Sequence, residues 1–173
     1  YEGKREDLAR LIPEGAGRVL DVGCGMGGLG VCARRILGGR IEMTGIELDR
    51  RAGGAAEKNY DRVLVGDAEE IDLPFEEGYF DCIIYGDVLE HFLDPWGLLK
   101  KHGRFLKKGG RVIASIPNIA HYRIVRMLRR KEWNYSDAGI LDRTHIRFFT
   151  IKGIRDMFEG AGMEIIKVER PDA

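Results

Sequence analysis

Four acidic residues in the first half of the chain have the chemistry needed to bind a polar nucleoside ligand. Asp21, Glu47, Asp67 and Asp87 each stand at or just beyond the end of a short apolar run. Carboxylates accept hydrogen bonds from ribose hydroxyls and adenine amino groups, and they attract ammonium and sulfonium groups. Because open α/β sheets bind ligands at the carboxyl ends of their strands, we expect these side chains to gather at one sheet edge.

A glycine-rich loop follows the first of these apolar runs. Gly23, Gly25 and Gly28 satisfy the pattern G-x-G-x-x-G, in which glycines allow a sharp turn and the next helix offers free N–H groups. The loop alone fits a nicotinamide, a flavin or S-adenosylmethionine, and a plain tight turn is the structural alternative. Asp21 favours S-adenosylmethionine, because a carboxylate there would repel pyrophosphate and attract an ammonium or sulfonium group.

Two further acids are placed to bind the nucleoside part of a cofactor. Glu47 ends the second apolar run, where an acidic residue can accept hydrogen bonds from a ribose diol of either kind of cofactor. Asp67, followed by Ala68, comes after the third run, where a carboxylate can accept from an adenine amino group. A helix N-cap or a turn is an equally good interpretation of Asp67.

Histidines are the natural general bases for an acceptor that loses a proton in the reaction. Methyl transfer to a hydroxyl needs such a base, whereas transfer to an amine lone pair does not. Among the histidines we predict that His145 is the base and that His91 is its nearest rival, with a structural role as the alternative for His91. His102 is expected on a solvated helix surface and His121 at a helix start.

A divalent metal is an alternative interpretation of some of the same residues. Asp87, Glu90 and His91 form a D-x-x-E-H segment, and His145 could supply a further ligand. Carboxylates and imidazoles together suit Mg²⁺, Mn²⁺ or Zn²⁺. Because Asp87 is short and already assigned to the cofactor, we predict no metal site, and loss of activity on chelation would contradict this.

These residues lie in a pattern of short apolar runs that alternate with helical spacing, which is typical of a parallel sheet with crossover helices. Strands are predicted over residues 18–22, 41–46, 63–65, 81–85, 111–116 and 164–168. Helices are predicted over residues 5–12, 29–37, 51–59, 95–106, 120–130 and 151–160, the first capping one sheet edge. Residues 131–147 are polar, aromatic and irregular, and a loop of this length is often functional.

The composition fits one globular domain. The chain has 173 residues, and its 28 basic and 28 acidic residues cancel, so we expect no nucleic-acid partner. Three cysteines without a C-x-x-C pair argue against disulfides and thiolate zinc, and no apolar run approaches the ~20 residues of a membrane span. We therefore predict a single domain over residues 1–173 of a cytoplasmic protein.

The motifs together resemble those of class I S-adenosylmethionine-dependent methyltransferases. The resemblance covers roughly residues 5–118 and rests on VLDVGCG at 19–25, GIELD at 45–49, GDA at 66–68, DVLEH at 87–91 and KGGRV at 108–112. It implies cofactor roles for nine residues: Asp21, Gly23 and Gly25 at the methionine end, Glu47 at the ribose, Leu48, Asp67 and Ala68 at the adenine, and Asp87 and Val88 beside the ribose and methionine.

A later stretch resembles a narrower, bacterial subgroup of these enzymes. The matching motifs are SIPNIAHY at 115–122, WNY at 133–135 and LDRTHIRFFT at 141–150. The subgroup is associated with polysaccharide and glycan assembly, which implies a sugar hydroxyl or a similar small acceptor. Residues 120–150 are expected to form an acceptor-side insert that acts as a wall and partial lid.

A basic segment within that insert could recognise an acceptor phosphate. Arg123, Arg126 and Arg130 recur at helical spacing and are expected to share one face. A solvated amphipathic surface, contact with a membrane surface and RNA binding are alternative interpretations. The apolar side chains of the segment are expected to face the protein: Ile124, Val125 and Leu128.

The sequence thus predicts an α/β fold with a doubly wound, mostly parallel, Rossmann-like sheet. The last antiparallel strand of the resembled family has no counterpart in the pattern, and a second copy of the chain or a fusion partner would complete that open edge. The predicted function is S-adenosylmethionine-dependent O-methylation of a small, sugar-like or phosphorylated acceptor. A cofactor-binding scaffold module of a larger enzyme and an NAD-dependent oxidoreductase are the alternatives.

Overall fold

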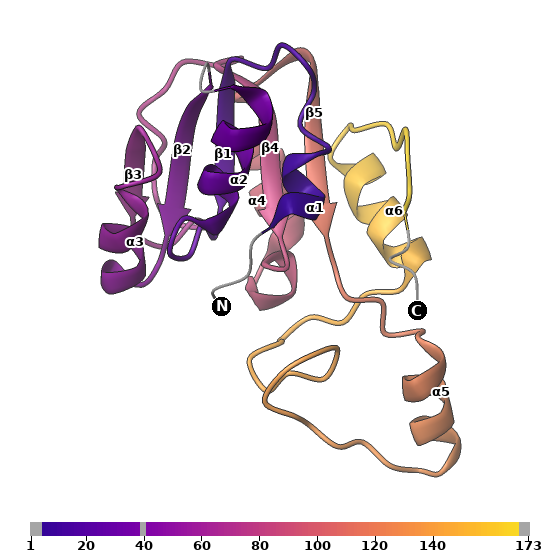
Figure 1. Ribbon diagram of the computed structural model, residues 1–173. Coiled ribbons are helices and arrows are strands. Elements are labelled where there is room, and N and C mark those ends of the chain that lie inside the picture. Colours follow the sequence, from indigo (N-terminus) through magenta and orange to yellow (C-terminus); the bar gives the residue numbers. More distant parts are fainter. Residues whose placement is uncertain (1–4, 39–40, 170–173) are drawn as a thin grey trace. The chain divides into compact units, whose positions relative to one another are not determined.

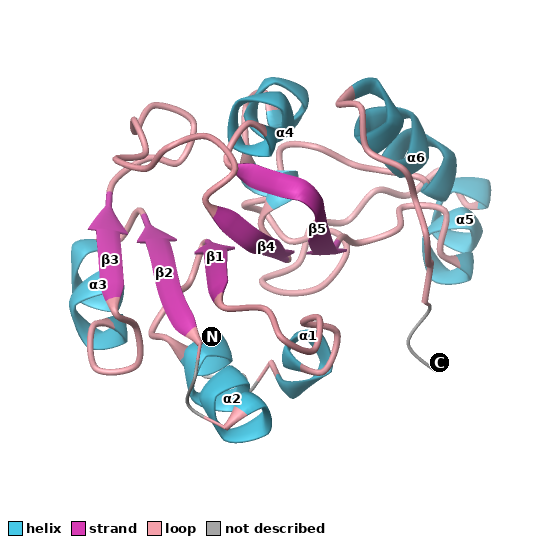
Figure 2. Ribbon diagram, turned by 90° about the horizontal axis from the view of Figure 1, so that it is seen from above, coloured by secondary structure: helices cyan, strands magenta, loops and turns pink. Residues whose placement is uncertain are grey.

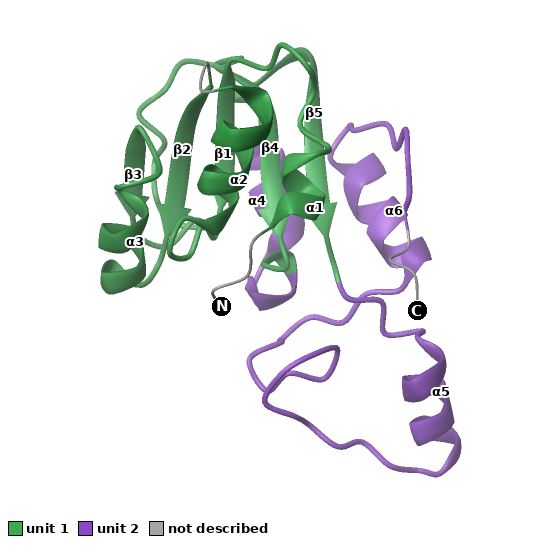
Figure 3. Cartoon of the chain, in the orientation of Figure 1, with its two compact units in different colours: residues 1–89, 104–116 green, residues 90–103, 117–173 purple. Residues whose placement is uncertain are grey.

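The computed structural model describes residues 5–38 and 41–169. Within these residues every helix is too short or too polar to span a bilayer. The chain divides into two compact units, unit 1 with residues 1–89 and 104–116 and unit 2 with residues 90–103 and 117–173 (Figure 3). The single domain over residues 1–173, with its insert at 120–150, stays a prediction.

Unit 1 contains a five-stranded parallel sheet (Figures 1 and 2). Its strands are β1 (Arg18–Val22), β2 (Glu42–Glu47), β3 (Arg62–Val65), β4 (Phe80–Gly86) and β5 (Leu106–Ser115). Their order is β3-β2-β1-β4-β5, and every neighbouring pair is parallel. The order reverses its direction between β1 and β4, and such switch points are where open α/β sheets bind ligands.

Three helices lie on one face of this sheet (Figure 2): α1 (Glu6–Ala9), α2 (Gly28–Leu37) and α3 (Arg50–Ala56). Val19 and Met43 of the strands belong to one buried cluster with Leu8 of α1 and Leu29 of α2. The prediction that residues 5–12 cap a sheet edge is wrong, because Leu8 buries its side chain against β4 and α1 packs beside α2.

The strands carry buried apolar residues at successive positions, so both faces of the sheet are covered. Side chains along a strand point alternately to the two faces. In β4, Cys82 and Ile84 join the cluster under the helices, whereas Ile83 and Tyr85 point the other way and are buried as well. This agrees with the predicted α/β fold. Within the described residues β5 ends the strand order, and completion of that edge by another copy or a fusion partner stays a prediction.

Unit 2 contains the helices α4 (Pro95–Gly103), α5 (Tyr122–Arg129) and α6 (Ile151–Gly160). A short 3₁₀ turn, η1 (Leu89–His91), leads into it from β4. Helices α4 and α6 contact each other, and the ring centroid of Trp96 lies 6.0 Å from that of Phe149. Residues 131–147 form neither helix nor strand, as predicted, apart from one isolated bridge between Ser136 and Asp142.

The sequence predictions for His102 and for residues 164–168, both in unit 2, are wrong. His102 is fully buried rather than solvated, because helical spacing places it on the apolar stripe of Leu98 and Leu99. Residues 164–168 form no strand, because no described segment is hydrogen-bonded alongside them, and the side chain of Ile166 stays 68% exposed.

Candidate functional site

The loop after β1 turns sharply at three glycines. Gly23, Gly25 and Gly27 have positive φ angles of 76°, 54° and 89°, and Gly23 N donates to Ile46 O of β2 at 2.9 Å. A Cβ on Gly23 would lie 2.7 Å from Cγ2 of Val88, whereas a Cβ on Gly25 would meet no described atom within 4 Å. Glycine is therefore required for the close approach at Gly23, and the backbone at Gly25 borders on open space that a ligand can enter.

Glu47, at the end of β2, fixes this loop with its side chain. Its Oε2 accepts a hydrogen bond from Gly25 N at 2.8 Å, and its Oε1 accepts one from Asp49 N at 2.9 Å. The next side chain, Leu48, is 72% exposed. The end of β2 therefore offers an ordered carboxylate beside an apolar surface that a flat ring could cover.

Asp67 and Ala68 follow β3 at the same edge of the sheet. Gly66 N donates to Glu47 O at 2.9 Å, which joins the ends of β2 and β3. Oδ1 of Asp67 accepts from Glu69 N at 2.9 Å, so the turn that the sequence allowed for Asp67 is present. Asp67 is exposed and Ala68 is buried. Since a carboxylate has about four acceptor positions, the exposed side chain of Asp67 keeps the capacity to bind a ligand.

Asp21, near the end of β1, is buried and bonded to a tyrosine. Its side chain accepts a hydrogen bond at Oδ2 from Tyr60 Oη at 2.5 Å. Burial raises the pKa of the Asp21 carboxyl to about 6, against the hydrogen bond from Tyr60, which lowers it. Tyr60 could not be identified from the sequence, because its place after α3 does not indicate that its hydroxyl bonds a carboxylate of β1.

Asp87, directly after β4, is held by two side chains from other elements. Its φ angle is 53°, which is uncommon outside glycine. Its Oδ2 accepts from Arg5 Nη1 at 2.7 Å, and its Oδ1 accepts from Ser115 Oγ at 2.6 Å. Sequence analysis did not assign a site role to Arg5 or Ser115. These contacts fix the conformation of the residue that precedes Val88.

The carboxyl edge, meaning the carboxyl ends of β1 to β4, differs from the amino edge of the same sheet. A hollow at the amino edge is lined by basic and acidic side chains. Arg34 pairs there with Asp61 at 2.7 Å, and Lys107 pairs with Asp81 at 2.5 Å. Because these charges neutralise each other, the amino edge is an ion-pair network. All nine predicted cofactor residues lie instead at the carboxyl edge.

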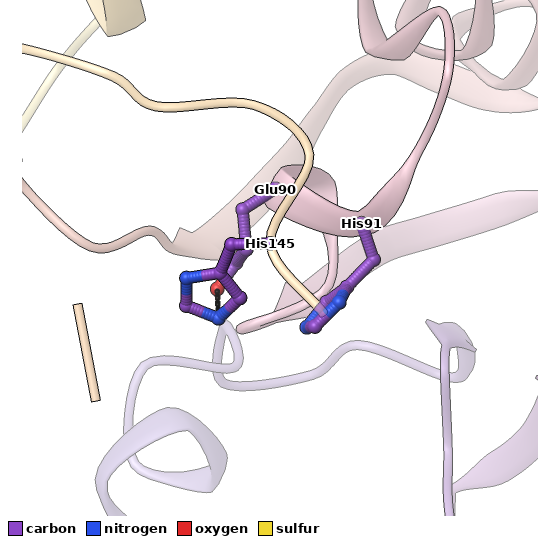
Figure 4. A group of neighbouring side chains, drawn as sticks. All are labelled: Glu90, His91 and His145. Atoms are coloured by element: carbon purple, nitrogen blue, oxygen red, sulfur yellow. Dashed lines mark ion pairs between the residues drawn. The ribbon is translucent and has the colours of Figure 1, made fainter. Parts of the chain in front are cut away.

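In unit 2 the structure brings together the two histidines that the sequence singled out. Glu90, His91 and His145 form a group, here called the Glu90 cluster (Figure 4). The rings of His91 and His145 are 4.8 Å apart between centroids, and Nε2 of His145 lies 3.8 Å from Oε1 of Glu90. The Glu90 residue is 1% exposed, so a buried carboxylate stands beside two imidazoles.

Backbone carbonyls orient both rings of the Glu90 cluster. Nδ1 of His91 lies 3.1 Å from Thr144 O, and Nδ1 of His145 lies 3.1 Å from Ile140 O. A carbonyl oxygen can only accept, so we assign the proton to Nδ1 in each ring. In the neutral imidazoles this leaves the lone pair on Nε2, which can act as a base or as a ligand.

For the basic helix α5, the predicted cap is present, but only part of the predicted burial is observed. His121 caps it as expected, since its Nδ1 accepts from Arg123 N at 3.3 Å. Ile124 is buried, but Val125 and Leu128 are 44% and 50% exposed. The prediction that these two face the protein is therefore wrong, because in α5 only the Ile124 side chain is buried.

Comparisons with known proteins show which chains this one resembles. A 27-O-demethylrifamycin SV methyltransferase of Amycolatopsis mediterranei is 31% identical over 61% of this chain and 40% of its own length. A demethylmenaquinone methyltransferase of Bacillus cytotoxicus is 25% identical over 98% of this chain and 79% of its own. The crystal structure of a Thermotoga maritima S-adenosylmethionine-dependent methyltransferase, described as a possible histamine N-methyltransferase, has a TM-score of 0.68 at 25% identity, covering 94% of this chain and 70% of that one.

The family match decides between the cofactors that the glycine loop left open. Residues 2–168 match the methyltransferase domain family, which excludes the nicotinamide oxidoreductase. The two relatives and the solved structure described above are named as methyltransferases, and that structure as one that depends on S-adenosylmethionine. The chain belongs to the methyltransferase domain family and is an S-adenosylmethionine-dependent methyltransferase.

Proposed function

We propose that this enzyme methylates an oxygen atom of a small acceptor that is sugar-like or phosphorylated. The observation that carries the proposal is the pair of imidazoles, His91 and His145, whose Nδ1–H groups face carbonyl oxygens, so that each neutral ring has its lone pair on Nε2. A hydroxyl acceptor needs its proton removed as the new bond forms, and a positioned base contributes about 10²–10⁴-fold. A relative named for a 27-O-demethyl substrate supports transfer to oxygen.

The methionine end and the ribose of the cofactor are assigned to the loop after β1 and to Glu47. When it is bound, S-adenosylmethionine supplies an electrophilic methyl group on a sulfonium. Gly23 and Gly25 line its methionine end, because the backbone is open to a ligand at Gly25. Glu47 binds the ribose, because its two bonds to Gly25 N and Asp49 N leave acceptor positions on the carboxylate.

The adenine is assigned to the ends of β2 and β3. Leu48 offers an exposed apolar side chain that packs on the base, and the exposed carboxylate of Asp67 accepts from the amino group, with Ala68 alongside. Asp87 and Val88 lie beside the ribose and methionine. Their positions are fixed by the Arg5 and Ser115 contacts and by the close packing on Gly23.

Asp21 contributes charge rather than direct contact. Its side chain is buried and bonded to Tyr60, so its negative charge acts through space on the ammonium and sulfonium groups of the cofactor. Because its pKa is about 6, this charge is present at neutral pH and is lost in mild acid.

The acceptor side is assigned to the Glu90 cluster and to α5. His145 is the group that promotes loss of the acceptor proton, with His91 as its rival, and Oε1 of the buried Glu90 lies 3.8 Å from its Nε2. On α5, Arg126 and Arg130 are exposed, and no acidic side chain in the described part of the chain pairs with them. Their guanidinium groups can therefore bind an acceptor phosphate through charge-assisted hydrogen bonds.

A direct test is an acceptor panel with the purified full chain. The chain is incubated with S-adenosylmethionine and glycosides, sugar phosphates, phenols, amines or thiols, and adenosylhomocysteine and methylated products are measured by mass spectrometry. We expect O-methyl products, with phosphorylated sugars preferred over their unphosphorylated counterparts. Methylation confined to amines or thiols would contradict the proposal.

A further inference from the structure

Three metal-ligating side chains converge in unit 2 from two segments of the chain. Glu90 and His91 belong to η1, and His145 belongs to the irregular stretch at 131–147. One ligand atom from each residue lies within 4.8 Å of the others. Figure 4 shows the His145 ring against the Glu90 carboxylate, with the His91 ring beside them.

The hydrogen bonds of the two rings are those that metal-bound imidazoles make. A ligating histidine nearly always donates its second ring N–H to a carbonyl or carboxylate, which fixes its tautomer and orientation. His91 makes this bond to Thr144 O and His145 makes it to Ile140 O, each at 3.1 Å. In this tautomer, Nε2 is the atom of each ring that would ligate an ion.

The backbone holds the two segments together without help from a ligand. Ile146 N and Arg147 N both donate to Glu90 O at 3.0 Å, which ties the residues after His145 to η1. His145 N donates to Asp142 O at 3.0 Å. A site that is held in place before its ligand arrives loses little entropy on binding.

The separation of the side chains suits a shared ion better than a direct bond. Nε2 of His145 and Oε1 of Glu90 are 3.8 Å apart, which is too long for a hydrogen bond. Two ligands of one tetrahedral zinc ion, each about 2.1 Å from the metal, are about 3.4 Å apart. The observed separation is therefore about 0.4 Å longer than that of two such ligands.

We propose that Glu90, His91 and His145 bind one divalent transition-metal ion through a carboxylate oxygen and two Nε2 atoms. Two imidazoles and one carboxylate suit Zn²⁺, Mn²⁺ or Fe²⁺ rather than Ca²⁺. Three protein ligands leave a coordination position open, as in catalytic metal sites. This differs from the sequence prediction of no metal site, which rested on the assignment of Asp87 to the cofactor, because the proposed site does not use Asp87.

The role of the ion, unlike its binding, rests on the proposed O-methylation. An acceptor hydroxyl in the open coordination position would lose its proton more readily, because a bound cation stabilises the alkoxide. In that case the imidazoles act as ligands, which takes the place of the direct general-base role given to His145 above, and the acceptor proton leaves to solvent or buffer.

Metal binding is tested with the full chain after removal of bound ions by a chelator and desalting. Co²⁺ and Zn²⁺ are titrated by calorimetry, Co²⁺ also by its visible absorption bands, and stoichiometry is measured by elemental analysis. We expect one ion per chain, with the affinity weakened at least about 100-fold in the single variants His91→Ala, His145→Ala and Glu90→Gln. His121→Asn, which keeps the helix cap outside the cluster, is the matched control.

Binding of adenosylhomocysteine by each variant shows that it is folded. The absence of one tightly bound ion, or an affinity that these cluster variants leave unchanged, overturns the metal site. If the ion binds as expected but only amines are methylated, the metal site is supported and the proposed O-methylation is contradicted. Full-rate O-methylation by the chelated chain overturns the catalytic role of the ion.

Discussion

The carboxyl edge of unit 1 and the Glu90 cluster of unit 2 are built in different ways. At the edge, each residue occupies a position set by a strand, and backbone bonds such as Gly23 N to Ile46 O tie neighbouring ends together. In the cluster, His145 stands in a stretch without helix or strand, tied to η1 by the bonds that Glu90 O accepts. In the proposed function, cofactor binding therefore depends on the order of the strands, whereas acceptor chemistry depends on an irregular segment, and such segments vary more readily than the sheet.

Replacing His145 should separate the two regions most clearly. We expect His145→Ala to lower kcat by about 10²–10⁴-fold while the Kd of adenosylhomocysteine changes by less than about twofold. Steady-state kinetics and calorimetry measure the two quantities. His121→Asn should keep both values, and a parallel loss of cofactor binding in His145→Ala would remove the distinction between the regions.

Replacing Gly23 should damage the carboxyl edge and with it the fold of unit 1. Gly23→Ala places a Cβ 2.7 Å from Val88 at a φ of 76°, so we expect a loss of about 2–3 kcal/mol in the free energy of unfolding and weaker cofactor binding. Denaturant unfolding measures the first. Gly54→Ala, in open space on α3, is the control and should be neutral or stabilising by up to about 1 kcal/mol.

A double variant shows whether the loss at Gly23 is steric. Val88→Ala in the Gly23→Ala background should restore part of the stability, because it removes the contacting methyl groups and leaves only the backbone strain. Strictly additive effects of the two substitutions would show that the contact between them is unimportant.

Removing the hydroxyl of Tyr60 should weaken the carboxyl edge less severely. Tyr60→Phe deletes the hydrogen bond to the buried Asp21 carboxylate, which should lower the free energy of unfolding by about 1.5–3 kcal/mol at neutral pH. Tyr79→Phe is the comparison, because the Tyr79 hydroxyl makes a less buried hydrogen bond to Glu42, and it should lose less than about 1 kcal/mol. Equal losses in both variants would contradict the importance of burial.

The pH dependence of cofactor binding should report on Asp21. As the pH falls through about 6, Asp21 takes up a proton, so we expect the affinity for adenosylmethionine to fall by up to about tenfold per pH unit. Asp21→Asn should flatten this profile between pH 5 and 7, as measured by calorimetry. A profile that the substitution leaves unchanged would assign the dependence to another group.

The same pKa shift has the opposite effect on the stability of the free protein. The folded carboxyl titrates near 6 rather than at its ordinary value of 3.8, so the folded state holds the proton more tightly than the unfolded chain. The contribution of Asp21 to the free energy of unfolding is therefore fully present below pH 3.8. It is lost as the pH rises from 3.8 through 6, and the total loss is about 3 kcal/mol.

The smallest effect is expected on α5. Charge reversal by Arg126→Glu with Arg130→Glu should raise the acceptor KM about threefold to tenfold and leave kcat unchanged, because exposed charges contribute little each. Steady-state kinetics with phosphorylated and unphosphorylated acceptors measure the change. A KM that stays the same for a phosphorylated acceptor would contradict phosphate binding by these arginines.

The parts of the fold that depend on local pattern could be predicted from the sequence. β1 and α6 have the predicted bounds, because an apolar run ending in glycines and a helical spacing capped by Thr150 are local signals. Residues 164–168 have the pattern of a strand, but no strand among the described residues is hydrogen-bonded to them. Whether a segment finds a neighbouring strand depends on the whole fold and cannot be predicted from its local pattern. His102 was misplaced because the neighbouring lysines concealed its position on the apolar stripe of α4.

The residue types at the site could be predicted, but their partners could not. Asp21 and Asp87 were identified from their places after strands, whereas Tyr60 and Arg5 contact them from elements far along the chain. The convergence of His145 on Glu90 depends on the path of an irregular segment. Such contacts follow from the packed chain and leave no periodic signal in the sequence.

The strand order also has a consequence for how the protein is made. β2 and β3 follow β1 directly, but the second neighbour of β1 is β4, which begins only at Phe80. During synthesis, β1, β2 and β3 therefore emerge from the ribosome before β4. Until β4 emerges, the N–H and C=O groups along one edge of β1 are unpaired, and Gly23 does not yet have its contact with Val88. During that interval the nascent chain presents an unpaired strand to its neighbours, and it is then that aggregation competes with folding.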